Sequence, residues 1–179
     1  MRKIIIKRIA VLAVLATMSV LLKTFSITNG LHRISFFDTP LILAGIIAGP
    51  IWGMVVAFVS DYLYSLLSGY AYSFIMMFSA LLWGAVGGIF YKRKVNLFFL
   101  LLVVLLTSFV TTAINTVQLL IWNGIDEVRV VLGLRITTML IKWPITTALV
   151  YVLYQRVVTV ILKDSLAIKN ENKSKVTKI

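Results

Sequence analysis

The sequence predicts an all-α integral membrane protein, folded as a compact bundle of six transmembrane helices. Of its 179 residues, 60% are hydrophobic, and the mean hydropathy is +1.00. A water-soluble domain of this size cannot hide so much apolar surface in one core. Long apolar runs also follow one another with only short polar breaks. We expect membrane segments at residues 9–25, 39–48, 51–67, 72–91, 96–122 and 134–161.

The first apolar run follows a basic start and lacks a small-x-small cleavage site, so we expect a retained helix and not a signal peptide. The second segment is unusually short. It starts at the cap-like Asp38-Thr39-Pro40 and stops at Gly49-Pro50. About 12 residues give only ~18 Å of helix, whereas a bilayer core needs ~20 residues. We expect this helix to pack inside the bundle, with local membrane thinning as a further hypothesis.

The last two segments are long. Residues 96–122 exceed the bilayer core and must tilt or project. Residues 134–161 contain Pro144, which frees the carbonyl of Leu140 and favours a kink. We expect one membrane domain over residues 1–162 and a polar, basic cytoplasmic tail over residues 163–179.

The charge distribution predicts that both termini are cytoplasmic. With the N-terminus inside, 13 of the 18 lysines and arginines fall on the cytoplasmic side of the six segments. The remaining five are Lys23, Arg33, Arg129, Arg135 and Lys142. The net charge of +12 is therefore attributed to cytoplasmic loops and not to nucleic-acid binding.

The composition argues against most catalytic chemistry. The chain has no cysteine, one histidine (His32) and six acidic residues, so it offers almost nothing for a metal site or a Ser-His-Asp triad. It has no phosphate-cradling Gly-Lys-Ser/Thr loop and cannot hydrolyse ATP alone. We therefore expect no enzyme, no metal and no cofactor.

Two predicted helices carry polar stripes. In residues 96–122 the stripe consists of Thr111, Asn115, Gln118 and Trp122. Helical spacing puts all four on one face, where they serve either interhelical hydrogen bonds or a ligand with a heterocyclic ring. In residues 134–161 the stripe consists of Arg135, Thr138 and Lys142. Arg135 lies near the outer end, whereas Lys142 lies two turns deeper and needs a carboxylate, a carbonyl or a wet cavity.

Other polar groups have two interpretations each. Asp61 is the only acid inside a predicted span. It either couples transport to a proton or cation, or forms a buried pair with one of four basic residues: Lys23, Arg33, Arg135 or Lys142. Near the outer loops, Arg33, Phe36 and Tyr72 suit an anionic aromatic ligand or an interfacial anchor belt.

The first segment carries a row of small residues: Ala10, Ala13, Ala16 and Thr17. Small side chains let another helix approach closely. This row serves either packing within the chain or docking of a partner protein.

Several motifs resemble one family. The stretch from residue 33 to residue 67 reads RISFFDTPLILAGIIAGPIWGMVVAFVSDYLYSLL. It resembles the second and third helices of S-components, the substrate-binding subunits of energy-coupling factor (ECF) vitamin transporters. The folate type is the most similar. Further matching motifs are Ala71-Tyr72, Ser79-Ala80, Asn115-Thr116, and Gly133-Leu134-Arg135 with the later Pro144.

The resemblance implies six helices and a vitamin site at the extracellular side. The resemblance implies these site residues: Arg33, Asn115, Gln118, Trp122, Arg135 and Lys142. With Phe36 and Tyr72 from the outer loops, they form the candidate substrate site. The implied ligand is folate or a reduced folate, and the implied partners are a transmembrane coupling subunit, EcfT, and two ATP-binding subunits, EcfA. The resemblance also implies the plasma membrane of a prokaryote and docking through the first helix.

Two departures from the family pattern leave alternatives open. Residues Phe74-Ile75-Met76 stand where the family has Pro-Gly-Phe, and the alanines of the first helix are three apart instead of four. An S-component for a pyridoxine- or pantothenate-like vitamin is one alternative. A membrane scaffold protein without a ligand is another.

Overall fold

The computed structural model describes residues 2–29, 32–69 and 72–158. Within them lie six α-helices, all of which were predicted. They are α1 (Arg2–Thr24), α2 (Asp38–Ala48), α3 (Pro50–Ser68), α4 (Phe74–Gly87), α5 (Leu97–Asn123) and α6 (Ile125–Leu153). Four of them, α1, α3, α5 and α6, are long and apolar enough to cross a membrane. The protein is therefore a multi-pass, all-α bundle. The predicted basic tail at residues 163–179 lies outside the described residues.

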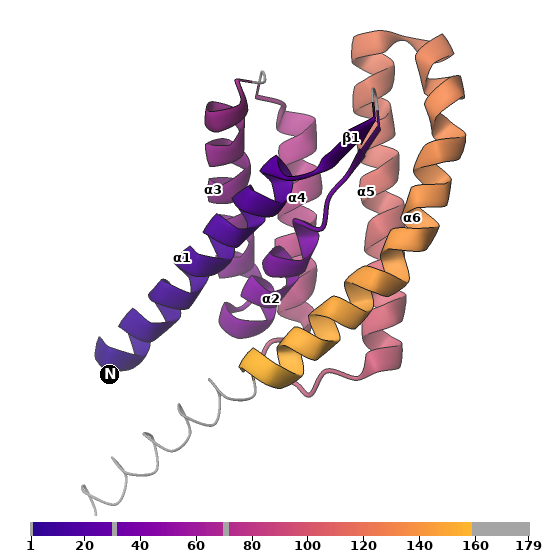
Figure 1. The fold of residues 1–179 in the computed structure, drawn as a ribbon. Coiled ribbons are helices and arrows are strands. Elements are labelled where there is room, and N and C mark those ends of the chain that lie inside the picture. The colour runs from indigo at the N-terminus through magenta and orange to yellow at the C-terminus, as the bar shows by residue number, and fades with distance from the viewer. Residues whose placement is uncertain (1, 30–31, 70–71, 159–179) are drawn as a thin grey trace, which may run out of the picture.

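The two ends of the helix bundle carry different parts of the chain. The N-terminal end of α1 and the C-terminal end of α6 lie at the same end (Figure 1). Towards the other end, the α1–α2 connection forms a small antiparallel hairpin of β1 (Ile27–Asn29) and β2 (His32–Ile34). The sequence predicted a loop there, because three-residue strands carry too little periodicity to be recognised.

The short helix α2 is enclosed by protein. Every residue from Asp38 to Ile47 is buried, and α2 packs against α1, α3, α4 and α6. The expectation that this short helix packs inside the bundle is therefore confirmed, whereas local thinning of the bilayer stays a hypothesis. The expected cap differs: Phe37 occupies the N-cap position, and Asp38 lies in the first turn, where its carboxylate pairs with Lys142 of α6.

Glycines let α2, α3 and α4 approach to backbone contact. A Cβ atom added to Gly84 would overlap the carbonyl of Gly53, and one added to Gly45 would overlap the carbonyl of Gly84. Close approach of helices at small residues is a common way to pack them in membranes. These three helices therefore form one tightly packed unit.

The ends of the later helices follow local signals. Asn96 caps α5 by accepting the backbone N–H of Phe98 at 3.1 Å. The C-terminal end of α4 continues as a 3₁₀ turn, η1 (Gly88–Phe90). The C-terminal end of α6 continues as a π-helical turn, η2 (Tyr154–Val158). Helix α6 begins nine residues before the predicted start at residue 134, because only Gly124, with φ of 88°, separates it from α5. Its charged first turns were mistaken for a loop.

Candidate ligand-binding cavity

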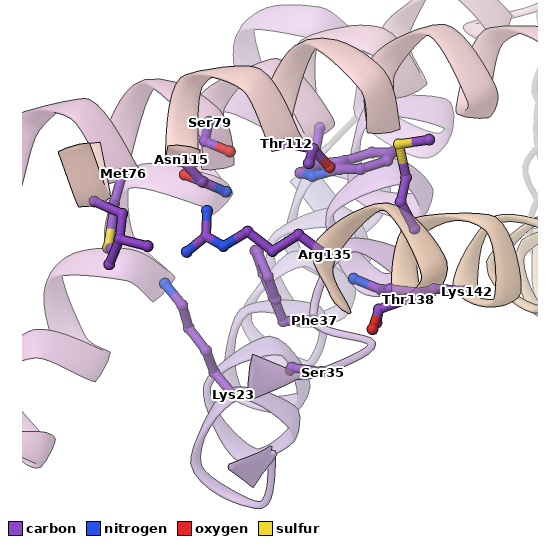
Figure 2. A pocket seen from close by; sticks show the side chains of 13 residues that line it. Lys23, Ser35, Phe37, Met76, Ser79, Thr112, Asn115, Arg135, Thr138 and Lys142 are labelled. Carbon is purple, nitrogen blue, oxygen red and sulfur yellow. The ribbon is translucent and has the colours of Figure 1, made fainter. Parts of the chain in front are cut away.

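A cavity of about 330 Å³ opens between α4, α5, α6 and the α1–α2 connection. This volume lies in the range of small-molecule sites. Its lining residues are Lys23, Ser35, Phe37, Met76, Ser79, Trp83, Thr112, Asn115, Leu119, Arg135, Thr138, Met139 and Lys142. Figure 2 shows their side chains converging from several helices on one space. The cavity lies in the half of the bundle that contains the hairpin, away from the end where α1 starts.

Helix α6 contributes the row that its spacing predicted. Arg135, Thr138 and Lys142 all line the cavity. Residues at i, i+3 and i+7 share one helical face, so a continuous α6 presents them together. The rotation of α6 therefore puts two cations into one cavity.

Arg135 is partly buried and extends towards Asn115 (Figure 2). Its guanidinium donates a hydrogen bond of 3.3 Å to Thr116 Oγ1. Among the residues that the structure describes, it makes no ion pair. A guanidinium in this setting offers several N–H donors to a carboxylate.

Asn115 and Ser79 each contribute a polar atom that is available for a hydrogen bond with a ligand. Asn115 Oδ1 and Ser79 Oγ are both buried and have no hydrogen-bond partner within the described part of the chain. A buried polar atom without a partner costs free energy, on the order of 1–3 kcal/mol. A ligand that donates to these atoms recovers this cost.

Two predicted residues of α5 do not line the cavity. Gln118 is 2% exposed and its Oε1 accepts a 2.8 Å hydrogen bond from Ser73, just before α4. Trp122 is 57% exposed and lies two helical turns beyond Asn115. The residues of α5 that reach the cavity are Thr112, Asn115 and Leu119.

The predicted residues of the connecting segments also differ from the cavity lining. Phe37 lines the cavity, whereas its neighbour Phe36 lines a smaller, apolar cavity of about 70 Å³. Arg33 pairs through its backbone with Thr28, and its side chain lies outside the described residues.

Tyr72 lies outside the cavity lining and packs its ring edge-on against Tyr62 and Phe74. Its hydroxyl is buried without a hydrogen-bond partner among the described residues.

Two lysines line the cavity, and each pairs with a buried carboxylate. Lys23, at the end of α1, pairs with Asp61 of α3. Lys142 Nζ lies 3.1 Å from Asp38 Oδ2 at the start of α2. The prediction that Asp61 pairs with one of four basic residues is confirmed, with Lys23 as the partner.

Phe37 connects these two pairs. The Lys23 ammonium lies 4.9 Å and the Lys142 ammonium 5.5 Å from its ring centre. Both distances are within the reach of a cation–π contact.

Sequence reasoning missed much of the apolar wall. Its residues are Phe37, Met76, Trp83, Leu119 and Met139. Within an apolar helix, nothing in the sequence distinguishes a residue that faces a cavity from one that faces lipid. Ser79 had a usable signal, because a lone hydroxyl in an apolar run needs a polar neighbour.

The small residues of α1 are divided between two faces. Ala10, Ala13 and Thr17 are exposed, and the Thr17 hydroxyl donates to the carbonyl of Ala13 at 3.0 Å. Ala16 is buried and belongs to the hydrophobic core. Three of the four therefore share an exposed surface, and Ala16 serves internal packing.

The comparisons with known proteins identify one family. Residues 7–154 match the family model described as ECF transporter, substrate-specific component. A comparison with curated protein sequences gave no match.

Two solved structures share the fold. The crystal structure of FolT bound with folic acid superposes with a TM-score of 0.75 at 25% identity, covering 83% of this chain and 93% of that one. The S component of a bacterial ECF transporter superposes with a TM-score of 0.61 at 22% identity, covering 87% of this chain and 97% of that one. Six apolar helices, a cavity inside the bundle and a family match over most of the length agree: the chain is a member of the family of substrate-specific components of ECF transporters.

Proposed function

We propose that this S-component binds folate or a reduced folate in the cavity beside Arg135. The proposal rests on two groups that line the same cavity. The partly buried guanidinium of Arg135 makes no ion pair among the described residues, and the amide oxygen of Asn115 has no hydrogen-bond partner among them. Folate joins a flat, hydrogen-bonding pteridine to a carboxylate-bearing tail. The similarity to FolT, which was solved with folic acid, supports the same ligand class.

The cavity supplies a complementary group for each part of such a ligand. Asn115 and Ser79 accept hydrogen bonds from the N–H groups of the pteridine edge. Trp83 offers aromatic surface for a ring face. Arg135 binds a carboxylate through charge-assisted hydrogen bonds.

The orientation follows from the basic residues. Lys92, Arg93 and Lys94 follow α4, and four further basic residues precede residue 9. The positive-inside rule puts these segments and both termini in the cytoplasm. The cavity then opens towards the extracellular side of the plasma membrane of a prokaryote, where it collects vitamin from outside.

Uptake then requires other subunits, because the sequence has no ATP-binding loop. We propose that the chain works with the coupling subunit EcfT and two EcfA ATPases. The exposed small residues of α1, Ala10, Ala13 and Thr17, form the proposed contact with the coupling subunit, where small side chains allow helices to approach.

Calorimetry on the purified protein in detergent tests the ligand. Folic acid and 5-formyltetrahydrofolate are expected to bind at micromolar concentration or below, whereas pyridoxine and pantothenate are not. Binding of pyridoxine or pantothenate alone would assign a different vitamin. Binding of none of these ligands, together with failure to co-purify ATPase subunits, would indicate a scaffold protein.

A further inference from the structure

The two buried carboxylates behind the cavity carry an inference about charge selectivity, which rests on the proposed function. We propose that Asp38 and Asp61 determine how many negative charges the cavity accepts. They do so by occupying Lys142 and Lys23, which leaves Arg135 as the available cation among the lining residues that the structure describes.

Asp38 is built to hold Lys142. It is 1% exposed, and it lies in the first turn of α2, where the helix dipole stabilises a negative charge. Its Oδ2 lies 3.1 Å from Lys142 Nζ and 3.5 Å from Thr146 Oγ1, so both contacts come from α6. Lys142 reaches the cavity wall with its charge already compensated.

Asp61 holds Lys23 in the same manner from α3. Asp61 is 4% exposed, and its carboxylate forms an ion pair with the Lys23 ammonium. The rings of Phe37 and Tyr64 each have their centre 4.9 Å from this ammonium. The lysine is thus fixed among a carboxylate and two aromatic faces, and does not project freely into the cavity.

The charges of the described lining residues determine the net charge that the cavity presents to a ligand. Lys23, Arg135 and Lys142 line the cavity, while both carboxylates lie behind two of these cations. Three positive and two negative charges leave one net positive charge. A ligand carboxylate at Lys23 or Lys142 must compete with a buried aspartate, and breaking a buried pair is costly. The first ligand carboxylate therefore contributes much more binding free energy than a second carboxylate does.

Removing one aspartate should release a second cation for the ligand. The test compares folic acid, which has two carboxylates, with pteroic acid, which has the same ring and linker but one carboxylate. We define the selectivity as the Kd of pteroic acid divided by the Kd of folic acid, measured by calorimetry. In Asp61→Asn, and equally in Asp38→Asn, this selectivity is expected to rise about tenfold, because the freed ammonium gains the second carboxylate.

Two controls separate this effect from unfolding and from overall charge. Asp126→Asn removes the same charge from an exposed position of α6 and is expected to leave the selectivity unchanged. The double variant Lys23→Met with Asp61→Asn removes both members of one pair and is expected to restore the wild-type selectivity. Each variant is first checked for a single gel-filtration peak and a cooperative thermal transition.

The outcomes distinguish this inference from the proposed function. If the wild-type protein binds neither pteridine, the proposed function fails and the charge assignment fails with it. If the wild-type protein binds folic acid, but Asp61→Asn and the double variant both keep the wild-type selectivity, only the charge assignment is overturned. An equal rise in Asp126→Asn overturns it as well. Because Asp61 and Asp38 occupy separate pairs, loss of folding in one variant leaves the other to decide.

Discussion

Ser73 Oγ donates a 2.8 Å hydrogen bond to Gln118 Oε1, and the same hydroxyl accepts the backbone N–H of Met76 at 3.4 Å. One hydroxyl thus caps α4 and ties it to α5. Met76 lines the cavity, so this connection fixes the distance between two of its walls. The buried amide of Gln118 has a structural partner, whereas the amide oxygen of Asn115, one turn earlier, has none among the described residues.

This difference predicts opposite effects of two leucine substitutions in α5. Gln118→Leu removes a buried hydrogen bond and should lower the free energy of unfolding by about 1–3 kcal/mol. Asn115→Leu should leave stability nearly unchanged and weaken folic acid binding about tenfold or more. Thermal unfolding and calorimetry on both variants measure the two effects. If Gln118→Leu lost affinity and kept its stability, Gln118 would be a ligand contact after all.

Arg135→Gln is expected to weaken folic acid binding by about tenfold to a hundredfold, the range of a lost charge-assisted hydrogen bond. Uncharged pterin, which has no carboxylate, should lose far less. Arg129→Gln is the matched control, because Arg129 lies earlier on the same helix and is exposed. Equal losses for folic acid and pterin would make Arg135 a structural residue that acts through Thr116.

The sequence predicts those features of the site that depend on a single helix, and it does not predict those that depend on how helices pack together. The row of Arg135, Thr138 and Lys142 was predicted because the period of an α-helix is fixed by its backbone. Of the four residues predicted to form the stripe on α5, Asn115 lines the cavity and Thr111, Gln118 and Trp122 do not. The polar residues of this stripe do share a face, but neighbouring helices decide which edge of that face meets the cavity, and here that edge carries Asn115 and not Gln118.

The sequence did not predict which residues far apart in the chain form pairs. Asp38 looked like a helix cap, and only the packing of α6 against α2 reveals Lys142 as its partner, 104 positions away. The choice between Phe36 and Phe37 likewise depends on the path of the chain after the hairpin. The six helices themselves were predictable because apolar length and charge asymmetry are properties of single segments.

Trp83 is expected to report ligand binding through its fluorescence. It lines the cavity and is 4% exposed, whereas Trp122 is 57% exposed and lies outside the lining. Trp83→Phe should therefore abolish most of the emission change that folic acid causes, and Trp122→Phe should preserve it. Calorimetry checks that Trp83→Phe still binds. Loss of the signal in Trp122→Phe alone would place the ligand nearer the C-terminal end of α5.

The glycine contacts predict a strong steric effect. Gly84→Ala adds a Cβ that overlaps the carbonyl of Gly53, so α3 and α4 must separate. We expect a destabilisation of about 1–3 kcal/mol or more, as for other overpacked cores. Gly133→Ala is the control, since a Cβ there meets no atom of the described residues within 4 Å. That change should stabilise α6 by about 0.5–1 kcal/mol, because alanine loses less backbone entropy than glycine. Thermal unfolding of both variants in the same detergent decides the matter.

The exposed small residues of α1 predict where the energising module binds. Ala13→Trp puts a bulky ring at the centre of the face formed by Ala10, Ala13 and Thr17, where close helix approach requires small side chains. Co-purification of the proposed partners, EcfT and EcfA, with the tagged variant should fall sharply. Folic acid affinity should stay at the wild-type value, because Ala13 is not among the cavity residues. Leu106→Trp places the same ring on α5, at a residue that is 58% exposed, and should leave co-purification intact. Equal capture by both variants would direct the search for the docking surface away from α1.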